Sequence, residues 1–333
     1  MQTTNARPGP GQARTGYWRL GGILAVLAGL AGFAGAGLVA SSPRPAAPAP
    51  ALVPPQAGAA ASLRERLAAV SWPADGVSAA GLSGAGVVAG PGATRPVPIA
   101  SVAKVMTAYV ILRDHPLPAG GPGPGIAILP SEAAAYPEQV RAGDSLVPVV
   151  AGETLTERQA LEALLLPSAD NVAWILARWD AGSQAAFVAR MNATARGLGM
   201  TGTTYTDPSG LDPSTVSTAA DQVRLGLAAM RLPALAAIAD ETTAVLPVAG
   251  LVRNYNTLLG QDGITGLKTG STQAAGGCVL LVARGGGRLI VAAAFGQPGT
   301  AQTILPNALD AGHALVLALA RALGHVDGPS SGT

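Results

Sequence analysis

The sequence predicts an α/β (α+β) fold in which one antiparallel sheet, flanked by helices, carries an inserted all-helical lobe. Strand patterns occur near both ends of the folded region, at 76–90 and 263–295, and the residues between them read mainly as helices. The glycines 285–287 join the apolar runs 277–283 and 288–295 into the strongest hairpin signal of the chain. A single sheet assembled from both ends would therefore enclose the helical residues as an insertion.

The first elements follow from short apolar runs and glycine-rich turns. Residues 63–70 are typical of a short amphipathic helix, and 76–82 and 86–90 of a two-stranded hairpin. Residues 101–112 form a strongly apolar run that predicts a buried helix. A loop rich in glycine and proline follows at 116–125.

The middle of the chain is predicted to be helical. We expect a helix over 156–166 with Glu157 and Glu162 on its polar side, and Pro167 ends this helix. Another helix resumes at 171–180. Further helices are expected at 184–198, 218–231 and, after the last strand, 304–323.

The N-terminal region predicts export. Residues 1–19 form a basic tail, and the uncharged stretch 20–42 just spans a bilayer core of roughly 30 Å as a helix. It is either an uncleaved transmembrane anchor or a signal peptide, and both readings keep the arginines in the cytoplasm. The proline- and alanine-rich linker 43–62 precedes the folded domain 63–326, and 327–333 is expected to be a disordered tail. The domain is thus expected at the extracytoplasmic face of the membrane or in the cell-wall space.

Charge and cysteine content exclude several classes of protein. Four arginines and no acidic residue precede Arg64, which leaves 17 basic and 19 acidic residues for the rest of the chain. The folded part therefore lacks the basic surface of a nucleic-acid-binding protein. Cys278 is the single cysteine, so no internal disulfide can form. The three histidines are too scattered to indicate a zinc site, and no metal or organic cofactor is expected.

The chain has only two lysines, Lys104 and Lys268, against nineteen arginines. Lysine can act as a base when it is buried, whereas arginine stays protonated. Ser101 and Lys104 are three residues apart on the expected helix, so their side chains share a face. Because a serine hydroxyl needs a neighbouring base to become a nucleophile, this pair could be a nucleophile and its base. An N-cap serine near a solvated lysine is the structural alternative.

Two further short motifs have both structural and chemical interpretations. Ser168 follows the break at Pro167, where it could cap the next helix or pass a proton, with Asp170 or Asn171 hydrogen-bonding Lys104 or a substrate. The segment 268–271, Lys-Thr-Gly-Ser, ends a predicted strand. A strand edge can bind an extended peptide, Gly270 permits close approach, and a lysine beside hydroxyl groups could hold a carboxylate. An exposed strand end is the alternative reading.

Together these motifs give the chain a family resemblance. Ser-x-x-Lys, a serine motif in the helical middle and Lys-Thr-Gly on a late strand form the signature set of penicillin-binding proteins and class A β-lactamases. The surrounding segments 98–109, 164–171, 199–211 and 263–270 resemble the D-alanyl-D-alanine carboxypeptidases, the low-molecular-weight penicillin-binding proteins. The resemblance covers roughly residues 65–325 and implies a β-lactamase/transpeptidase-like fold.

The resemblance also implies roles for individual residues. Ser101 would be acylated by a peptidoglycan stem peptide that ends in D-Ala-D-Ala, or by a β-lactam antibiotic. Lys104 would be the general base, and Ser168 would help to protonate the departing D-alanine. Lys268 and Thr269 would bind the terminal carboxylate. The backbone N–H groups of Ser101 and Ser271 would form the oxyanion hole.

Two departures from the family pattern affect substrate binding. The family usually has Asn two places after the second-motif serine, whereas this chain has Asp170 there and Asn171 next. The family also tends to carry an arginine after the last core strand, whereas here no arginine lies between 288 and 321, and Gln302 and Thr303 occupy that region. A β-lactamase-like hydrolase and a catalytically weak peptidoglycan-binding or regulatory module therefore remain as alternatives. The β-lactamase alternative lacks one expected feature, because no Glu-x-x-Asn segment follows Ser168.

Overall fold

The computed structural model describes Leu67, residues 70–118 and residues 120–324. These residues all belong to one compact unit, Pro54–Thr333. The expected basic tail, apolar segment, linker and C-terminal tail lie outside the described residues, as does most of the expected helix 63–70. None of the described helices is by itself long and apolar enough to cross a membrane. The bent pair 219–229 and 233–239 is long and apolar enough only when its two helices are counted together.

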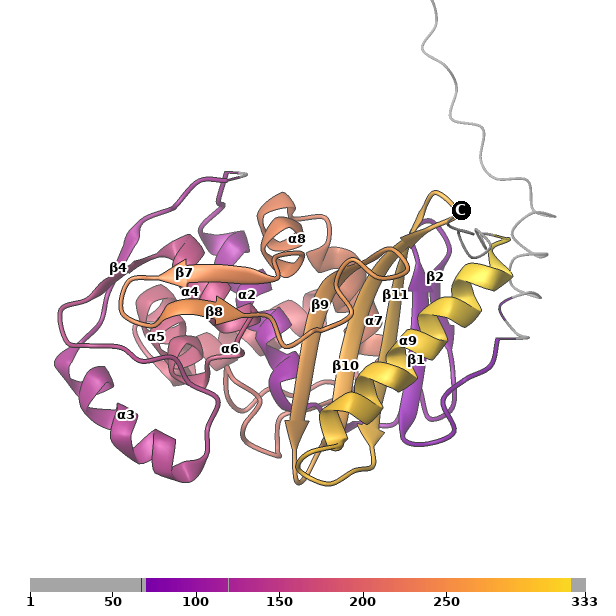
Figure 1. Ribbon diagram of the computed structural model, residues 1–333, viewed down its shortest axis with the longest axis horizontal. Coiled ribbons are helices and arrows are strands. Elements are labelled where there is room, and N and C mark those ends of the chain that lie inside the picture. The colour runs from indigo at the N-terminus through magenta and orange to yellow at the C-terminus, as the bar shows by residue number, and fades with distance from the viewer. Residues whose placement is uncertain (1–66, 68–69, 119, 325–333) are drawn as a thin grey trace, which may run out of the picture. The chain divides into compact units, whose positions relative to one another are not determined.

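A five-stranded antiparallel sheet is built from both ends of the described chain, as predicted (Figure 1). Its order is β2-β1-β11-β10-β9. The strands are β1 (Val77–Leu82), β2 (Gly86–Ala89), β9 (Ile264–Thr272), β10 (Gly276–Gly285) and β11 (Arg288–Gln297). β1 pairs with β11 across more than 200 residues of sequence, with Val77 opposite Phe295. This pairing closes the sheet around the inserted helices and leaves β9 at one edge.

Both faces of the sheet are buried, because side chains of opposite parity along each strand enter different hydrophobic cores. In β10, Val279 and Leu281 pack in the core under α9 (Ile304–Ala322), whereas Leu280 and Val282 pack in the larger core shared with the helical insertion. Figure 1 shows α9 lying along one face of the sheet and α7 on the other. Near-continuous apolar strands, rather than alternating ones, follow from this double burial.

The helices expected from residue 101 onward are present, with ends shifted by a few residues. The insertion contains the helices α2 (Lys104–Asp114), α3 (Pro130–Ala142), α4 (Glu157–Leu165), α5 (Asp170–Ala181), α6 (Gln184–Gly197), α7 (Ala219–Ala229) and α8 (Pro233–Ala239). Short strand pairs connect them: β3 (Val97–Pro98) with β6 (Val216–Ser217), β4 (Gly125–Ala127) with β5 (Thr154–Thr156), and β7 (Thr243–Leu246) with β8 (Gly250–Arg253). The helices α3 and α8 and these short pairs were not predicted from the sequence.

Two local expectations were wrong. Glu157 and Glu162 do not form a polar surface on α4, since they are 1% and 8% exposed. Arg158 pairs with Glu162 at 2.7 Å, so that a charge inside the lobe replaces solvent as the partner of the carboxylate. The first turn of the apolar helix is also not α-helical: Ala100–Ala103 form the 3₁₀ helix η1, and α2 begins only at Lys104.

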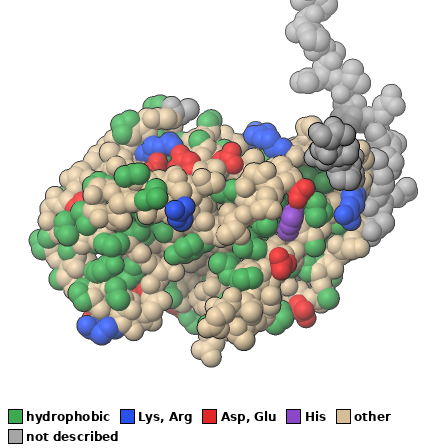
Figure 2. Space-filling model, viewed as in Figure 1, with side chains coloured by type: hydrophobic (Ala, Val, Ile, Leu, Met, Phe, Trp, Pro, Cys, Tyr) green, Lys and Arg blue, Asp and Glu red, His purple; other side chains and the backbone are tan. Residues whose placement is uncertain are grey.

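Charged side chains are few on the face of the molecule shown in Figure 2. On the face shown in Figure 2, acidic and basic side chains are scattered among apolar and neutral ones, and no large area of one sign is visible.

Candidate active site

The tight turn η1 presents Ser101 at the start of α2. Ala100, just before it, has a positive φ of 46°, and Ser101 is partly exposed while its neighbours are buried. A non-glycine residue with positive φ stores strain, and such strain is frequent at functional sites. The turn aims the Ser101 side chain towards Lys104, whose Nζ lies 2.8 Å from Ser101 Oγ. The predicted pair of hydroxyl and amine is therefore in contact.

Lys104 is fully buried, and its ammonium donates three hydrogen bonds. Its Nζ contacts Ser101 Oγ at 2.8 Å, Asp170 Oδ1 at 2.6 Å and the Ser209 carbonyl at 3.0 Å. A lysine ammonium has three N–H donors and no acceptor, so these contacts fill its capacity. The environment of Lys104 is therefore polar at its tip, although the helix around it is apolar.

Ser168 lies in the connection between α4 and α5 and does not cap α5. The N-cap of α5 is Ala169, which has no side-chain cap. Ser168 has a φ of 65°, is 4% exposed, and its Oγ has no hydrogen-bond partner in the described part of the chain. Most buried polar side chains are satisfied, so an unpartnered hydroxyl held in a strained backbone requires an explanation. The structural alternative for Ser168, a helix cap, is thereby excluded.

The edge strand β9 brings the third motif to the nucleophile. A Cβ placed on Gly270 would lie 2.8 Å from the Ser101 backbone nitrogen, so only glycine allows this approach. Lys268, two residues earlier, projects from the same face of the strand because side chains alternate. As an edge strand, β9 also keeps one row of backbone N–H and C=O groups without a sheet partner. A peptide can pair with that row next to Ser101.

The Lys268 ammonium is in an unfavourable environment. The side chain is 1% exposed and its Nζ donates to the carbonyl of Thr269 at 2.9 Å. Burial, followed by the charge of Lys104, holds the Lys268 pKa well below its usual value, and Asp170 opposes this effect. An anion bound beside Lys268 would stabilise its charged form. Thr269 is buried and Ser271 is exposed at the end of the same strand.

Asp170, and not Asn171, occupies the position beside Lys104. The second Asp170 oxygen, Oδ2, accepts from the Ser145 backbone N–H at 2.9 Å. The Asn171 side chain instead pairs with the backbone of Val147, donating to its carbonyl at 2.8 Å and accepting from its N–H at 3.3 Å. In this geometry Asn171 fixes the loop after α3, and Asp170 faces the buried amine.

The contact of Lys104 with the Ser209 carbonyl, in the loop 207–210, was not predicted from the sequence. Asp207 Oδ2 accepts from the backbone N–H groups of Ser209 and Gly210 at 3.1 and 2.8 Å, which folds the loop into a tight turn. Gly210 has a φ of 81°, and a Cβ there would lie 1.9 Å from the Ala100 carbonyl. This contact presses the loop against η1 and directs the Ser209 carbonyl at Lys104. The signal in the sequence was the turn-forming string Asp-Pro-Ser-Gly.

The region where the family pattern places an arginine is occupied by a self-contained turn. Thr300 Oγ1 donates to Gln302 Oε1 at 3.2 Å, and the Thr303 hydroxyl accepts from the Thr300 N–H at 2.9 Å. Both interactions are exposed and precede α9. The residues 300–303 include no cationic side chain that could help Lys268 to hold an anion at β9.

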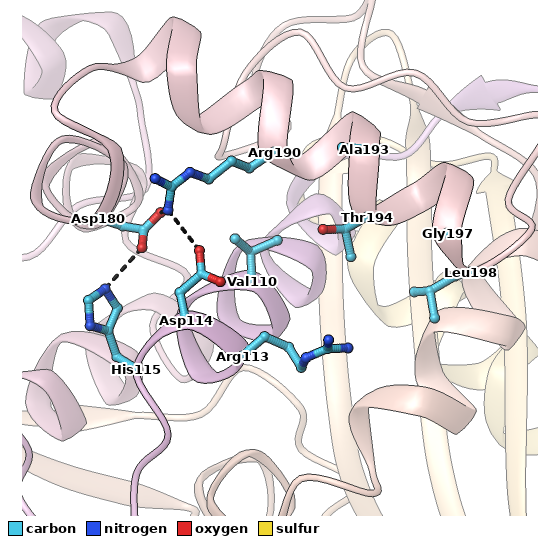
Figure 3. Close-up of a pocket in the computed structure, with 10 residues that line it drawn as sticks. All are labelled: Val110, Arg113, Asp114, His115, Asp180, Arg190, Ala193, Thr194, Gly197 and Leu198. Atoms are coloured by element: carbon cyan, nitrogen blue, oxygen red, sulfur yellow. Dashed lines mark hydrogen bonds and ion pairs between the residues drawn. The ribbon is translucent and has the colours of Figure 1, made fainter.

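A large pocket lies away from these residues. Its volume is about 880 Å³ and it opens at the C-terminal end of α2, about 15 Å along the helix from Lys104. Figure 3 shows Arg190 between Asp180 and Asp114, with distances of 2.9 and 2.8 Å, and His115 against Asp180 at 2.9 Å. These charges neutralise one another. The described residues contain no cluster of three histidine, cysteine or acidic side chains that could hold a metal ion.

Comparison with known proteins identifies similar sequences. A family model described as D-alanyl-D-alanine carboxypeptidase matches residues 83–299. A D-alanyl-D-alanine carboxypeptidase of Mycobacterium tuberculosis is 38% identical over 207 residues, covering 60% of this chain and 67% of that protein. A D-alanyl-D-alanine endopeptidase of Pseudomonas aeruginosa is 36% identical over 211 residues, covering 60% of this chain and 65% of that protein. The matches thus span about two thirds of the length of these relatives.

Solved structures share the fold. The Streptomyces K15 DD-transpeptidase aligns with a TM-score of 0.66 and 22% identity, covering 75% of this chain and 99% of that chain. A penicillin-binding protein homologue of Mycobacterium tuberculosis aligns with a TM-score of 0.63 and 31% identity, covering 79% and 97%. The predicted β-lactamase/transpeptidase-like fold, with an antiparallel sheet and an inserted helical lobe, is confirmed.

Proposed function

This chain belongs to the D-alanyl-D-alanine carboxypeptidase family of serine peptidases, and on that premise we propose that it removes the terminal D-alanine from peptidoglycan stem peptides through an acyl-enzyme. The observation that carries the proposal is the contact between Ser101 Oγ and Lys104 Nζ at 2.8 Å, beside the open edge of β9. Nucleophile and base within hydrogen-bond reach are the requirement for covalent catalysis by serine. The proposed reaction requires no metal or cofactor.

Acylation begins with proton transfer from Ser101 to the free amine of Lys104. Ser101 Oγ attacks the carbonyl between the two D-alanines and forms a tetrahedral oxyanion. The backbone N–H groups of Ser101 and Ser271 stabilise this oxyanion, an interaction worth about 3–4 kcal/mol where one such donor has been removed from an enzyme. The close approach of Gly270 to the Ser101 nitrogen supports this pairing of η1 with β9.

The leaving D-alanine needs a proton on its nitrogen. Ser168 supplies it, and the absence of any hydrogen bond to its buried Oγ within the described chain supports this role. The hydroxyl gives its proton to the departing amine and regains one from Lys104. Water then hydrolyses the ester at Ser101, with Lys104 again acting as the base.

The terminal carboxylate binds at β9. Lys268 provides the charge, and the hydroxyl of Thr269 provides a hydrogen bond. Burial lowers the pKa of Lys268, and a bound carboxylate would raise that pKa again because it stabilises the ammonium. The attraction between the two charges is stronger in this low-dielectric environment than at an exposed surface. Asp170 contacts Lys104 and Asn171 holds the loop at Val147, so both shape the cleft rather than contact the carboxylate.

The substrate places the domain outside the cytoplasm, at the cell wall. We infer that residues 20–42 act as the membrane anchor or as a cleaved signal peptide, and that 43–62 spaces the domain from the membrane. The uncharged length of 20–42 and the arginines before it support the inference.

A labelling experiment tests the proposed function. The full chain in mild detergent is incubated with a fluorescent penicillin and, separately, with diacetyl-Lys-D-Ala-D-Ala, and Ser101→Ala is the matched control. We expect labelling and D-alanine release that both require Ser101. Labelling without release would indicate a non-catalytic binding module, and rapid loss of label with lactam turnover would indicate a β-lactamase.

A further inference from the structure

The carboxylate of Asp170 stands where the family pattern has an uncharged amide. Its Oδ1 lies 2.6 Å from Lys104 Nζ, and its side chain is 4% exposed. Its backbone N–H and its Oδ2 both bind Ser145, at 2.7 and 2.9 Å. The carboxylate is therefore fixed in position by backbone groups, and its free oxygen is directed at the amine.

The contacts of Lys104 limit how it can become a base. An ammonium that donates to Ser101, Asp170 and Ser209 has no lone pair with which to accept the Ser101 proton. One proton must leave Lys104 before Ser101 can react. Of the three partners, Ser101 is the group to be deprotonated and Ser209 offers a neutral carbonyl. Asp170 Oδ1 is the one acceptor among them that can take and hold a proton.

We propose that Asp170 is the internal proton acceptor that converts Lys104 from ammonium to free amine; this inference rests on the proposed function. An N–H bond of Lys104 breaks as an O–H bond forms on Asp170 Oδ1. The freed lone pair takes the Ser101 proton while Oγ bonds to the substrate carbonyl carbon. Lys104 then passes that proton through Ser168 to the leaving nitrogen, and Asp170 returns its own proton at the end of the cycle.

Burial favours this transfer. An ion pair taken out of water loses solvation at both charges, whereas an amine beside a carboxylic acid loses far less. Lys104 is 0% exposed and Asp170 is 3% exposed. Two other titratable groups face the pair. Lys268 approaches from β9, and Asp144 approaches from the loop after α3, where burial and the charge of Asp170 raise the Asp144 pKa.

The proposal predicts a difference in pH dependence. While the pair shares one proton, the fraction in the amine–acid form does not depend on pH, since transfer is internal. Acylation by fluorescent penicillin at Ser101 is therefore expected to change by less than about twofold per pH unit between pH 6 and 8. Asp170→Asn has no internal acceptor, so the proton of the amine must go to solvent and the acylation rate is expected to rise with pH across this range.

The experiment measures second-order acylation rates of the full chain across this range. Asp144→Asn is the matched control, because it removes a neighbouring carboxyl group that makes no contact with Lys104, and its profile should parallel the wild type. Thermal unfolding checks that Asp170→Asn is folded at each pH. A parallel profile for Asp170→Asn and wild type overturns the inference and leaves the proposed function intact. Failure of wild-type labelling, or labelling that persists in Ser101→Ala, overturns the proposed function itself.

Discussion

Removing the hydroxyl of Ser168 separates a structural role from a catalytic one. In the described chain its Oγ is buried without a hydrogen-bond partner. Burying an unsatisfied polar group costs about 1–3 kcal/mol, so Ser168→Ala should stabilise the domain by at least about 1 kcal/mol. For a domain of this size that raises the midpoint of thermal unfolding by about 2–4 °C. The strained φ of 65° is kept in this variant, so it does not contribute to the difference.

The same substitution should slow catalysis. A positioned proton donor contributes about 10²–10⁴-fold to a rate, so we expect D-alanine release and penicillin acylation to fall by at least about 100-fold. A variant that gains stability while it loses activity indicates a residue retained for chemistry. A purely structural serine would show the opposite, with stability lost and little change in rate.

Ser78→Ala is the matched control. Ser78 lies in β1, is 1% exposed, and its Oγ also has no partner within the described residues. It shares a strand face with Ala80, on the side of the sheet covered by α9, so it is remote from Ser101. We expect a similar gain in thermal midpoint and unchanged acylation. If Ser168→Ala lowers the midpoint, or acylates within about threefold of the wild type, the assignment of Ser168 to proton transfer is refuted.

Three further predictions use the same assays. Gly270→Ala places a Cβ 2.8 Å from the Ser101 nitrogen, and we expect acylation to fall about 100-fold, as for loss of an oxyanion-hole donor; a change of less than twofold would contradict the close contact. Burial raises the pKa of Glu157 from 4.5 to about 7, so the carboxyl group stabilises the fold below pH 4.5 and that stabilisation is lost as pH rises through about 7. At pH 8, the free energy of unfolding of Glu157→Gln should therefore exceed that of the wild type by about 1–2 kcal/mol after solvent screening, and its thermal midpoint should be higher. At pH 4.5 the two midpoints should be nearly the same, and equal midpoints at pH 8 would argue against the buried charge. Cys278 is buried and its pKa is raised to about 12 by desolvation, so iodoacetamide at pH 8 should alkylate it in urea but not in the native protein, and native labelling would indicate an open sheet edge.

Much of the fold could be predicted because its strands and helices follow local patterns. The hairpin of β10 and β11 has a three-glycine turn between two apolar runs, and the structure pairs Gly285 with Arg288 across that turn. The helix α4 begins at a capping box in which the Thr156 hydroxyl accepts from the N–H of Gln159 at 3.2 Å. By contrast, α3 contains Pro137 and buries none of its residues, so hydrophobic periodicity could not reveal it.

The active site was only partly predictable. Ser101, Lys104 and Lys268 could be found because they stand in short motifs on one helix and one strand. The carbonyl of Ser209 and the backbone of Ser145 could not, because a backbone group carries no signature in the sequence. Their contribution depends on how two loops fold against η1 and α5, which tertiary packing determines.

The choice between Asp170 and Asn171 shows why adjacent positions are hard to assign from sequence. On a helix, neighbouring residues point about 100° apart, so whichever residue begins α5 fixes which side chain faces Lys104. The backbone sets that start: Ser168 takes a positive φ, Ala169 is extended, and the Asp170 N–H binds Ser145. A strained serine thus determines which side chain meets the base. Loss of that strain in Ser168→Gly should loosen the register as well as remove the hydroxyl, so its acylation rate should fall below that of Ser168→Ala.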